Sequence, residues 1–200
     1  MNTELQQGLA ILEKRAATAR FLIVAVAGLT GVHLIGLVLV TSGSLSSDAM
    51  FVGDWHVVDL IGIPSLIAIV ASIVAVAMWI HRAHANLAAA DLHGLDYTPG
   101  WAVGWYFVPI ANLFKPFQAM RELWNASHGA LGDYKHPAPG LLWVWWLTWI
   151  FSNLSSSGDS YETIDLIGLA LTAVSAGCLY MIVNTITRRQ HSMDIAETFA

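Results

Sequence analysis

The sequence predicts an all-α, polytopic membrane protein with four transmembrane helices in two hairpins and a proline-broken segment between the second and third helices. Three observations support this fold. Of the 200 residues, 56% are hydrophobic and 12% are charged, whereas a soluble domain usually carries about 25% charged residues. The apolar residues gather in runs close to the roughly 20 residues that cross a bilayer as a helix. One orientation also places every basic residue on the same side. Residues 1–200 are therefore expected to form a single integral membrane domain.

Four apolar runs are the expected transmembrane helices. The first exceeds the roughly 7–15 apolar residues of a cleavable signal sequence, so it is expected to remain as an anchor. The third is short and holds four of the nine tryptophans, at positions 143, 145, 146 and 149, which is typical of an aromatic belt at the lipid head groups. The runs are residues 20–41, 58–80, 139–154 and 164–186.

The basic residues predict the orientation. None of the nine lies in loop 41–58 or in loop 155–164, which carry aspartate and glutamate instead. Because basic residues favour the cytoplasmic side, four crossings place both termini and the middle segment in the cytoplasm. The nine are Lys14, Arg15, Arg20, Arg82, Lys115, Arg121, Lys135, Arg188 and Arg189.

The tetrapeptide Asp-Leu-Ile-Gly occurs twice, at residues 59–62 and 165–168, and each copy opens an apolar run. Arg82 and Arg188 each follow the aspartate by 23 residues, which is about 34 Å of helix, or one membrane thickness. We expect a parallel repeat of two hairpins, related by an axis along the membrane normal. Each aspartate then stands at a helix N-terminus, where the helix dipole and the backbone N–H groups favour an acid.

A second interpretation makes the outer ends of these helices a cation site. Imidazole and carboxylate groups suit several transition metals, and both kinds occur at that depth. The opposing interpretation is that a histidine inside the membrane bonds to a neighbouring helix. The candidate metal ligands are His33, His56, Asp59 and Asp165.

The segment at residues 99–125 is expected to be re-entrant or to lie in the membrane interface. Its apolar part is too short to span, and Pro99, Pro109 and Pro116 interrupt it. Beyond Pro109 the apolar residues recur at three- and four-residue spacing, as in an amphipathic helix at a membrane surface or beneath a bundle. Irregular backbone is tolerated in a membrane where it lines a cavity or is buried in protein. The segment is therefore the leading candidate for a functional site, and a structural plug is the alternative.

The stretches "WIHRAHANL", "TPGWAVGWYFVPIANLFKPFQAMRELWNAS", "LLWVWWLTWI" and "ITRRQ" resemble the bacterial membrane proteins grouped as domain of unknown function 4328. The resemblance runs over residues 79–190, more than half of the chain. It implies a multi-helix protein of the bacterial inner membrane, and it implies no activity.

Three classes of function stay open. The first, which we favour, is a non-enzymatic protein that handles a small solute, a lipid or an ion through the segment on the cytoplasmic side. The second is a scaffold that binds another membrane protein or a second copy of itself. The third is a metal- or haem-binding redox protein, for which His81 and His84 are a candidate pair.

No cofactor is firmly implied by the sequence, and no nucleic-acid partner is expected. The expected partner is the lipid bilayer, with anionic lipid near the basic groups of the middle segment. The candidate ligand-binding residues are Arg82, Asn86, Trp101, Trp105, Asn112, Lys115, Gln118, Arg121 and Glu122.

Overall fold

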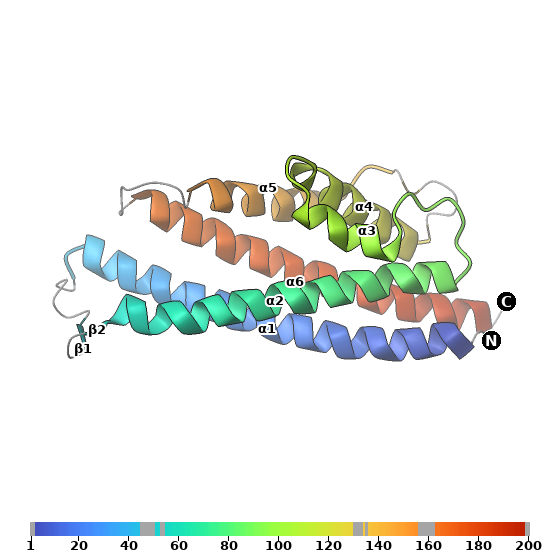
Figure 1. The fold of residues 1–200 in the computed structure, drawn as a ribbon, viewed down its shortest axis with the longest axis horizontal. Helices are drawn as coiled ribbons and strands as arrows, with labels where there is room; N and C mark the ends of the chain where they lie inside the picture. Colours follow the sequence, from blue (N-terminus) through green and yellow to red (C-terminus); the bar gives the residue numbers. More distant parts are fainter. Residues whose placement is uncertain are drawn as a thin grey trace.

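The computed structural model describes residues 3–44, 51–52, 55–129, 134, 136–155 and 163–198. Within these residues the chain forms α-helices, two 3₁₀ turns and one short antiparallel pair of strands (Figure 1). The helices are α1 (Thr3–Thr41), α2 (Val57–Ala89), α3 (Pro99–Gly104), α4 (Lys115–Ser127), α5 (Gly140–Ser155) and α6 (Thr163–Thr198). The 3₁₀ turns are Trp105–Phe107 and Ala111–Leu113, and the strands are β1 (Phe51–Val52) and β2 (Trp55–His56).

Three long helices, α1, α2 and α6, run side by side along the molecule (Figure 1). They have 39, 33 and 36 residues, so each is about 50–60 Å long. Each holds a segment long and apolar enough to cross a membrane, namely Thr3–Thr41, Gly62–Ala89 and Leu166–Ser192. The helices continue beyond the predicted crossings on the side of the termini, because charged residues on an exposed face do not end a helix that packs on its neighbours.

The third predicted crossing, at residues 139–154, corresponds to α5, which packs antiparallel on the first half of α6. The hydroxyl of Ser175 donates to the carbonyl oxygen of Trp145 at 3.3 Å between these two helices. Helix α5 has 16 residues, or about 24 Å, which is short of the roughly 30 Å of hydrocarbon in a bilayer. The structure thus confirms a helical protein with three candidate spans among its described residues, and the crossing by α5 stays a prediction.

The buried core lies in the half of the molecule that holds both termini. Among the described side chains of α1 the buried ones end at Ile23, and in α2 they begin at Ala75. In the other half, Ile35 of α1 and Leu66 of α2 are each 62% exposed. Apolar side chains can stay exposed there because lipid, unlike water, is as apolar as they are. The core includes Leu5, Leu9, Leu12, Trp79, Leu87, Met120, Leu123, Ile182 and Ile186.

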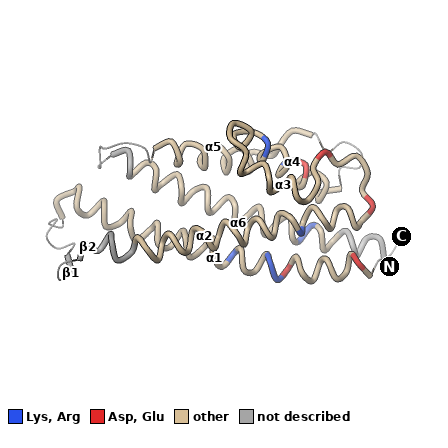
Figure 2. The backbone as a smooth tube through the Cα atoms, viewed as in Figure 1, with Lys and Arg blue, Asp and Glu red and all other residues tan. Residues whose placement is uncertain are grey.

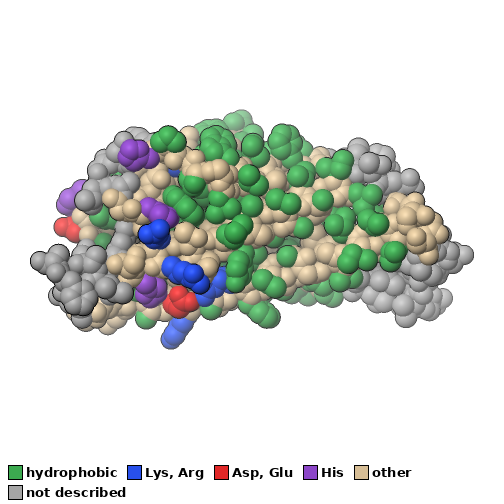
Figure 3. Space-filling view, turned by 180° about the vertical axis from the view of Figure 1, so that it is seen from behind, with side chains coloured by type: hydrophobic (Ala, Val, Ile, Leu, Met, Phe, Trp, Pro, Cys, Tyr) green, Lys and Arg blue, Asp and Glu red, His purple; other side chains and the backbone are tan. Residues whose placement is uncertain are grey.

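The charged residues follow the same division. The Lys and Arg residues coloured in Figure 2 lie in the half that holds both termini. Seen from behind, basic and histidine side chains gather towards that end, and hydrophobic side chains cover the middle of the molecule (Figure 3). This separation is typical of a membrane protein whose charged end faces the cytoplasm.

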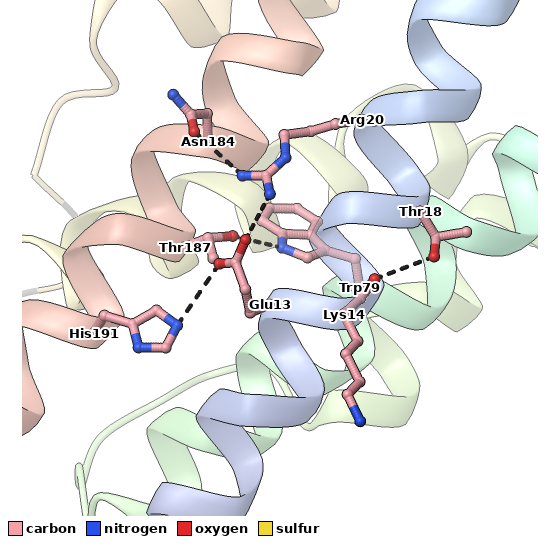
Figure 4. A network of polar contacts seen from close by, with 8 residues as sticks. All are labelled: Glu13, Lys14, Thr18, Arg20, Trp79, Asn184, Thr187 and His191. Atoms are coloured by element: carbon pink, nitrogen blue, oxygen red, sulfur yellow. Dashed lines mark hydrogen bonds and ion pairs between the residues drawn. The ribbon is translucent and has the colours of Figure 1, made fainter.

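Polar contacts join the long helices within the charged half (Figure 4). Glu13 of α1 accepts from Arg20 at 2.6 Å and lies 3.7 Å from His191 of α6. The buried indole of Trp79 on α2 donates to the hydroxyl of Thr187 on α6 at 3.1 Å. These contacts fix α1 and α2 against α6 where the helices leave the apolar zone.

Asp59 and Asp165 are each the third residue of their helix, α2 and α6 respectively. Both therefore stand in the first turn, where the helix dipole favours an acid. Their side chains lie outside the described residues, so capping stays a prediction. The α1–α2 and α5–α6 pairs are both hairpins, but α5 is less than half as long as α1, and the parallel repeat also stays a prediction.

Candidate functional site

The proline-broken segment folds as a helical hairpin, and two of its three prolines stand where a helix starts. Pro99 opens α3, and the hydroxyl of Thr98 accepts from the backbone N–H of Trp101 at 3.4 Å as the N-cap. Pro116 stands in the first turn of α4. Both positions suit proline, since the first turn of a helix needs no N–H donor there. The closed end of the α3–α4 hairpin points towards the half of the molecule without Lys and Arg (Figures 1 and 2).

Helix α4 is packed into the bundle and does not lie on its surface. It contacts α2, α5 and α6. The indole of Trp146 on α5 donates to the carbonyl oxygen of Leu113 at 3.2 Å, and the ring of Phe117 lies 4.4 Å from that of Trp143. The hairpin is therefore held in place at its tip as well as along α4. The buried residues of α4 are Pro116, Phe117, Ala119, Met120, Glu122, Leu123, Asn125, Ala126 and Ser127.

A pocket of about 300 Å³ opens between the start of this hairpin and the connector that follows α2. Four of the predicted ligand-binding residues line it: Trp101, Trp105, Lys115 and Gln118. Three more lining residues, at positions 96–98, were missed by the sequence analysis. They are Asp96, Tyr97 and Thr98.

Lys115 is the cationic group of the pocket. Its Nζ lies 5.8 Å from the centre of the Tyr97 ring and 5.7 Å from that of Trp105, within the range of a cation–π contact. The Trp101 and Trp105 rings lie 4.8 Å apart and extend this aromatic wall. Lys115 is also the first residue of α4, whose N-terminus has no side-chain cap. The helix dipole adds positive potential at the same corner of the pocket.

The Tyr97 wall is held in place by two residues of α4. The Tyr97 hydroxyl donates to Oε1 of Gln118 at 2.8 Å. The carboxylate of Glu122 accepts from the backbone N–H groups of Asp96 at 2.6 Å and Tyr97 at 3.2 Å. Glu122 is only 4% exposed, so it lies behind the pocket wall and supports it.

The pKa of Tyr97 is raised above its ordinary value. Burial is the main cause, the charges of Glu122 and Asp96 act in the same direction, and Arg121 opposes them. The phenol therefore keeps its proton at neutral pH and stays a hydrogen-bond donor. The groups that line the pocket are one ammonium, one carboxylate, one amide, phenol and threonine hydroxyls, and two indole rings.

The other predicted ligand-binding residues lie outside the lining of this pocket. Arg82 donates to Oδ1 of Asn86 at 2.7 Å, and Asn86 donates to Gln190 of α6 at 3.2 Å. These two residues therefore belong to the interface between α2 and its long neighbours. Oδ1 of Asn112 and Nε of Arg121 are buried in the described structure without a hydrogen-bond partner.

The metal site stays a prediction, and among the residues that the structure describes no group of three His, Cys, Asp or Glu lies close enough to hold an ion. His33 is half-buried on α1, whereas the side chains of His56, Asp59 and Asp165 lie outside the described residues. His84 is buried, with Nδ1 3.1 Å from the Ile80 carbonyl oxygen, and the neighbouring His81 is exposed. The two histidines therefore do not face one common partner.

Comparison with known proteins identifies the family of this chain. Neither the curated proteins nor the solved structures gave a match. The family model described as "Domain of unknown function (DUF4328)" matches residues 41–188, which is well over half of the chain and includes the α3–α4 hairpin. This match confirms the resemblance seen in the sequence, and the chain belongs to the family of domain of unknown function 4328.

Proposed function

We propose that this protein binds the anionic group of a small solute or lipid in the Lys115 pocket, at the cytoplasmic face of the cell membrane. The observation that carries the proposal is the position of Lys115, held against two aromatic rings in a pocket of about 300 Å³. A partly buried ammonium group gains stability from a counter-charge. The uncapped N-terminus of α4 favours the same sign of ligand. Asp96 is exposed, so the anion is expected on the Lys115 side of the pocket.

The proposal includes a topology of four crossings, with α5 as the third and both termini in the cytoplasm. The described Lys and Arg residues all lie in the half with both termini, which supports this orientation (Figure 2). Helix α5 is about 6 Å shorter than the hydrocarbon layer, a mismatch that local thinning of the bilayer accommodates at modest cost. In this orientation the pocket lies at the level of the cytoplasmic head groups.

Equilibrium dialysis of detergent-solubilised protein against radiolabelled glycerol phosphate tests the proposal. The substitution Lys115→Met removes the charge at similar length, and Lys14→Met removes an equal charge from the exposed face of α1. A charged hydrogen bond contributes about 1.5–3 kcal/mol, so Lys115→Met should weaken binding about 10- to 150-fold. Lys14→Met should leave the affinity unchanged, and Lys115→Arg should retain most of it.

Thermal unfolding of each variant shows whether it is folded. Folded Lys115→Met protein that binds glycerol phosphate as tightly as the parent would refute the proposed function. Absence of binding by the parent protein would refute it as well.

A further inference from the structure

The tip of the α3–α4 hairpin begins and ends at the pocket. Residues 106–114 connect Trp105 to Lys115, and these two residues meet at 5.7 Å between ring centre and Nζ. The loop between them therefore lies directly beside the pocket. Its large apolar side chains are exposed: Phe107 by 72%, Ile110 by 78%, Leu113 by 56% and Phe114 by 45%.

The backbone presents these side chains outward in a fixed conformation. Ile110 has a positive φ of 68° with ψ −52°, and the N–H of Ala111 donates to the Pro109 carbonyl oxygen at 2.7 Å. This is a tight γ-turn, which a β-branched residue adopts only under strain. The bond from Trp146 to the Leu113 carbonyl oxygen holds the same loop on α5. The γ-turn and the bond to Trp146 therefore hold the apolar tip in one conformation, with its side chains exposed.

The direction of the tip indicates what covers it. The closed end of the hairpin points away from the half of the molecule that holds the basic residues (Figures 1 and 2). Helix α5, which holds this loop through Trp146, also exposes apolar side chains, with Val144 at 45%, Leu147 at 44% and Phe151 at 54%. An exposed apolar surface of this kind, beside a helix expected to cross the membrane, lies at the boundary between the head groups and the acyl chains.

The pocket volume limits which part of a ligand it can hold. A volume of about 300 Å³ equals that of about ten water molecules in the liquid, at about 30 Å³ each. That is space for a phosphate with a glycerol-sized group, and it is too little for an acyl chain as well. A ligand with both parts must place its chain outside the pocket, where the tip provides an apolar surface.

We propose that the ligand is a phospholipid of the cytoplasmic leaflet, with its phosphate at Lys115 and an acyl chain along the tip formed by Phe107, Ile110, Leu113 and Phe114. This inference rests on the proposed function and adds the class of ligand. The phosphate supplies the counter-charge for Lys115. The chain covers side chains that water would otherwise contact. The hairpin thus contacts both the phosphate and an acyl chain of one lipid molecule.

Binding of two phosphates to the detergent-solubilised protein tests this inference. One is glycerol phosphate, and the other is lysophosphatidic acid, which carries the same head group with one acyl chain. The lysolipid should bind at least about tenfold more tightly, since each buried CH₂ group contributes about 0.8 kcal/mol. Phe107→Ser should weaken lysolipid binding about fivefold, because the acyl chain then packs against less apolar surface. The same substitution should leave glycerol phosphate binding unchanged.

Phe21→Ser is the matched control, because Phe21 on α1 is also 72% exposed but lies far along the chain from the tip. It should change neither affinity. If Phe107→Ser does not fold, Ile110→Gly replaces it, since glycine relieves the positive φ while removing the side chain.

The outcomes separate the two proposals. Glycerol phosphate that binds as tightly as the lysolipid would overturn the lipid assignment and leave the anion pocket standing. Failure of glycerol phosphate to bind would overturn the pocket itself, whether or not the lysolipid binds. A folded tip variant with unchanged lysolipid affinity would overturn the role of the tip.

Discussion

Replacing Glu122 by glutamine should loosen the attachment of the pocket wall to α4. The carboxylate accepts two backbone N–H groups, from Asp96 at 2.6 Å and from Tyr97 at 3.2 Å, and it is 4% exposed. Glutamine offers one oxygen, so one N–H must face an NH₂ donor instead. A hydrogen bond to a charged group contributes about 1.5–3 kcal/mol, and a buried donor left unsatisfied costs about 1–3 kcal/mol. The expected loss for Glu122→Gln is therefore about 2–3 kcal/mol in the free energy of unfolding.

Denaturant titration in detergent measures this loss, and Glu13→Gln is the matched control. Glu13 also accepts a short bond, from Arg20 at 2.6 Å, but its side chain is 48% exposed. A half-exposed ion pair contributes about 1 kcal/mol or less, so Glu13→Gln should cost much less than Glu122→Gln. Glu122→Gln should also weaken glycerol phosphate binding, because the Tyr97 ring is no longer fixed beside Lys115. If the two variants were equally stable, or if Glu122→Gln kept full binding, the supporting role of Glu122 would be refuted.

Three other experiments test the helix contacts, the pocket phenol and the topology. Trp79→Phe should lower the free energy of unfolding by about 1–2 kcal/mol, because it removes the buried bond to Thr187. When Thr187→Val is already present, the further loss caused by Trp79→Phe should be small. Additive losses in this double-mutant cycle would contradict the bond. The pKa of the Tyr97 phenol is raised, because burial and nearby acids disfavour its charged form. Ultraviolet titration of Tyr97→Phe should therefore lose one phenol that ionises above about pH 10. Loss of a phenol that ionises at or below about pH 10 would contradict the raised pKa. With Cys178 replaced, a cysteine introduced at Ser157 should react with an impermeant reagent from outside the cell, and labelling from the cytoplasm alone would contradict the proposed topology.

Much of the fold follows from the sequence because lipid imposes simple rules. Long apolar runs and the placement of basic residues predicted the three long helices and where their charged ends gather. The full helix lengths did not follow, since hydropathy marks only the part of a helix that faces lipid. The residues of α1 around Leu5 and Leu12 are instead fixed by burial against neighbouring helices.

The pocket was predicted in part, and the missed residues have a physical explanation. The prolines indicated a broken segment, and four of its predicted residues line the pocket. Tyr97 was missed because it stands in a connector whose position depends on Glu122, a contact between residues 25 apart. The Thr98–Pro99 pair did carry a usable signal, since a threonine before proline is typical of a helix N-cap.

Arg82 and Asn86 show what the sequence leaves out, and their predicted role in binding stays a prediction. Their polar side chains near the middle segment suggested a binding role, whereas the structure directs Asn86 towards Gln190 of α6. The sequence shows how the polar residues are spaced on α2. It does not show which neighbouring helix each face of α2 contacts. That choice depends on how α1 and α6 pack around α2.

A crystal structure of the protein grown from a lipid phase tests the central claim most directly, because it shows what occupies the Lys115 pocket. We predict a lipid phosphate in the pocket, with one oxygen about 2.7–2.9 Å from Nζ of Lys115. The acyl chain of that lipid should run along Phe107 and Ile110. A pocket that holds only water, with lipid phosphates ordered elsewhere on the protein, would contradict the claim.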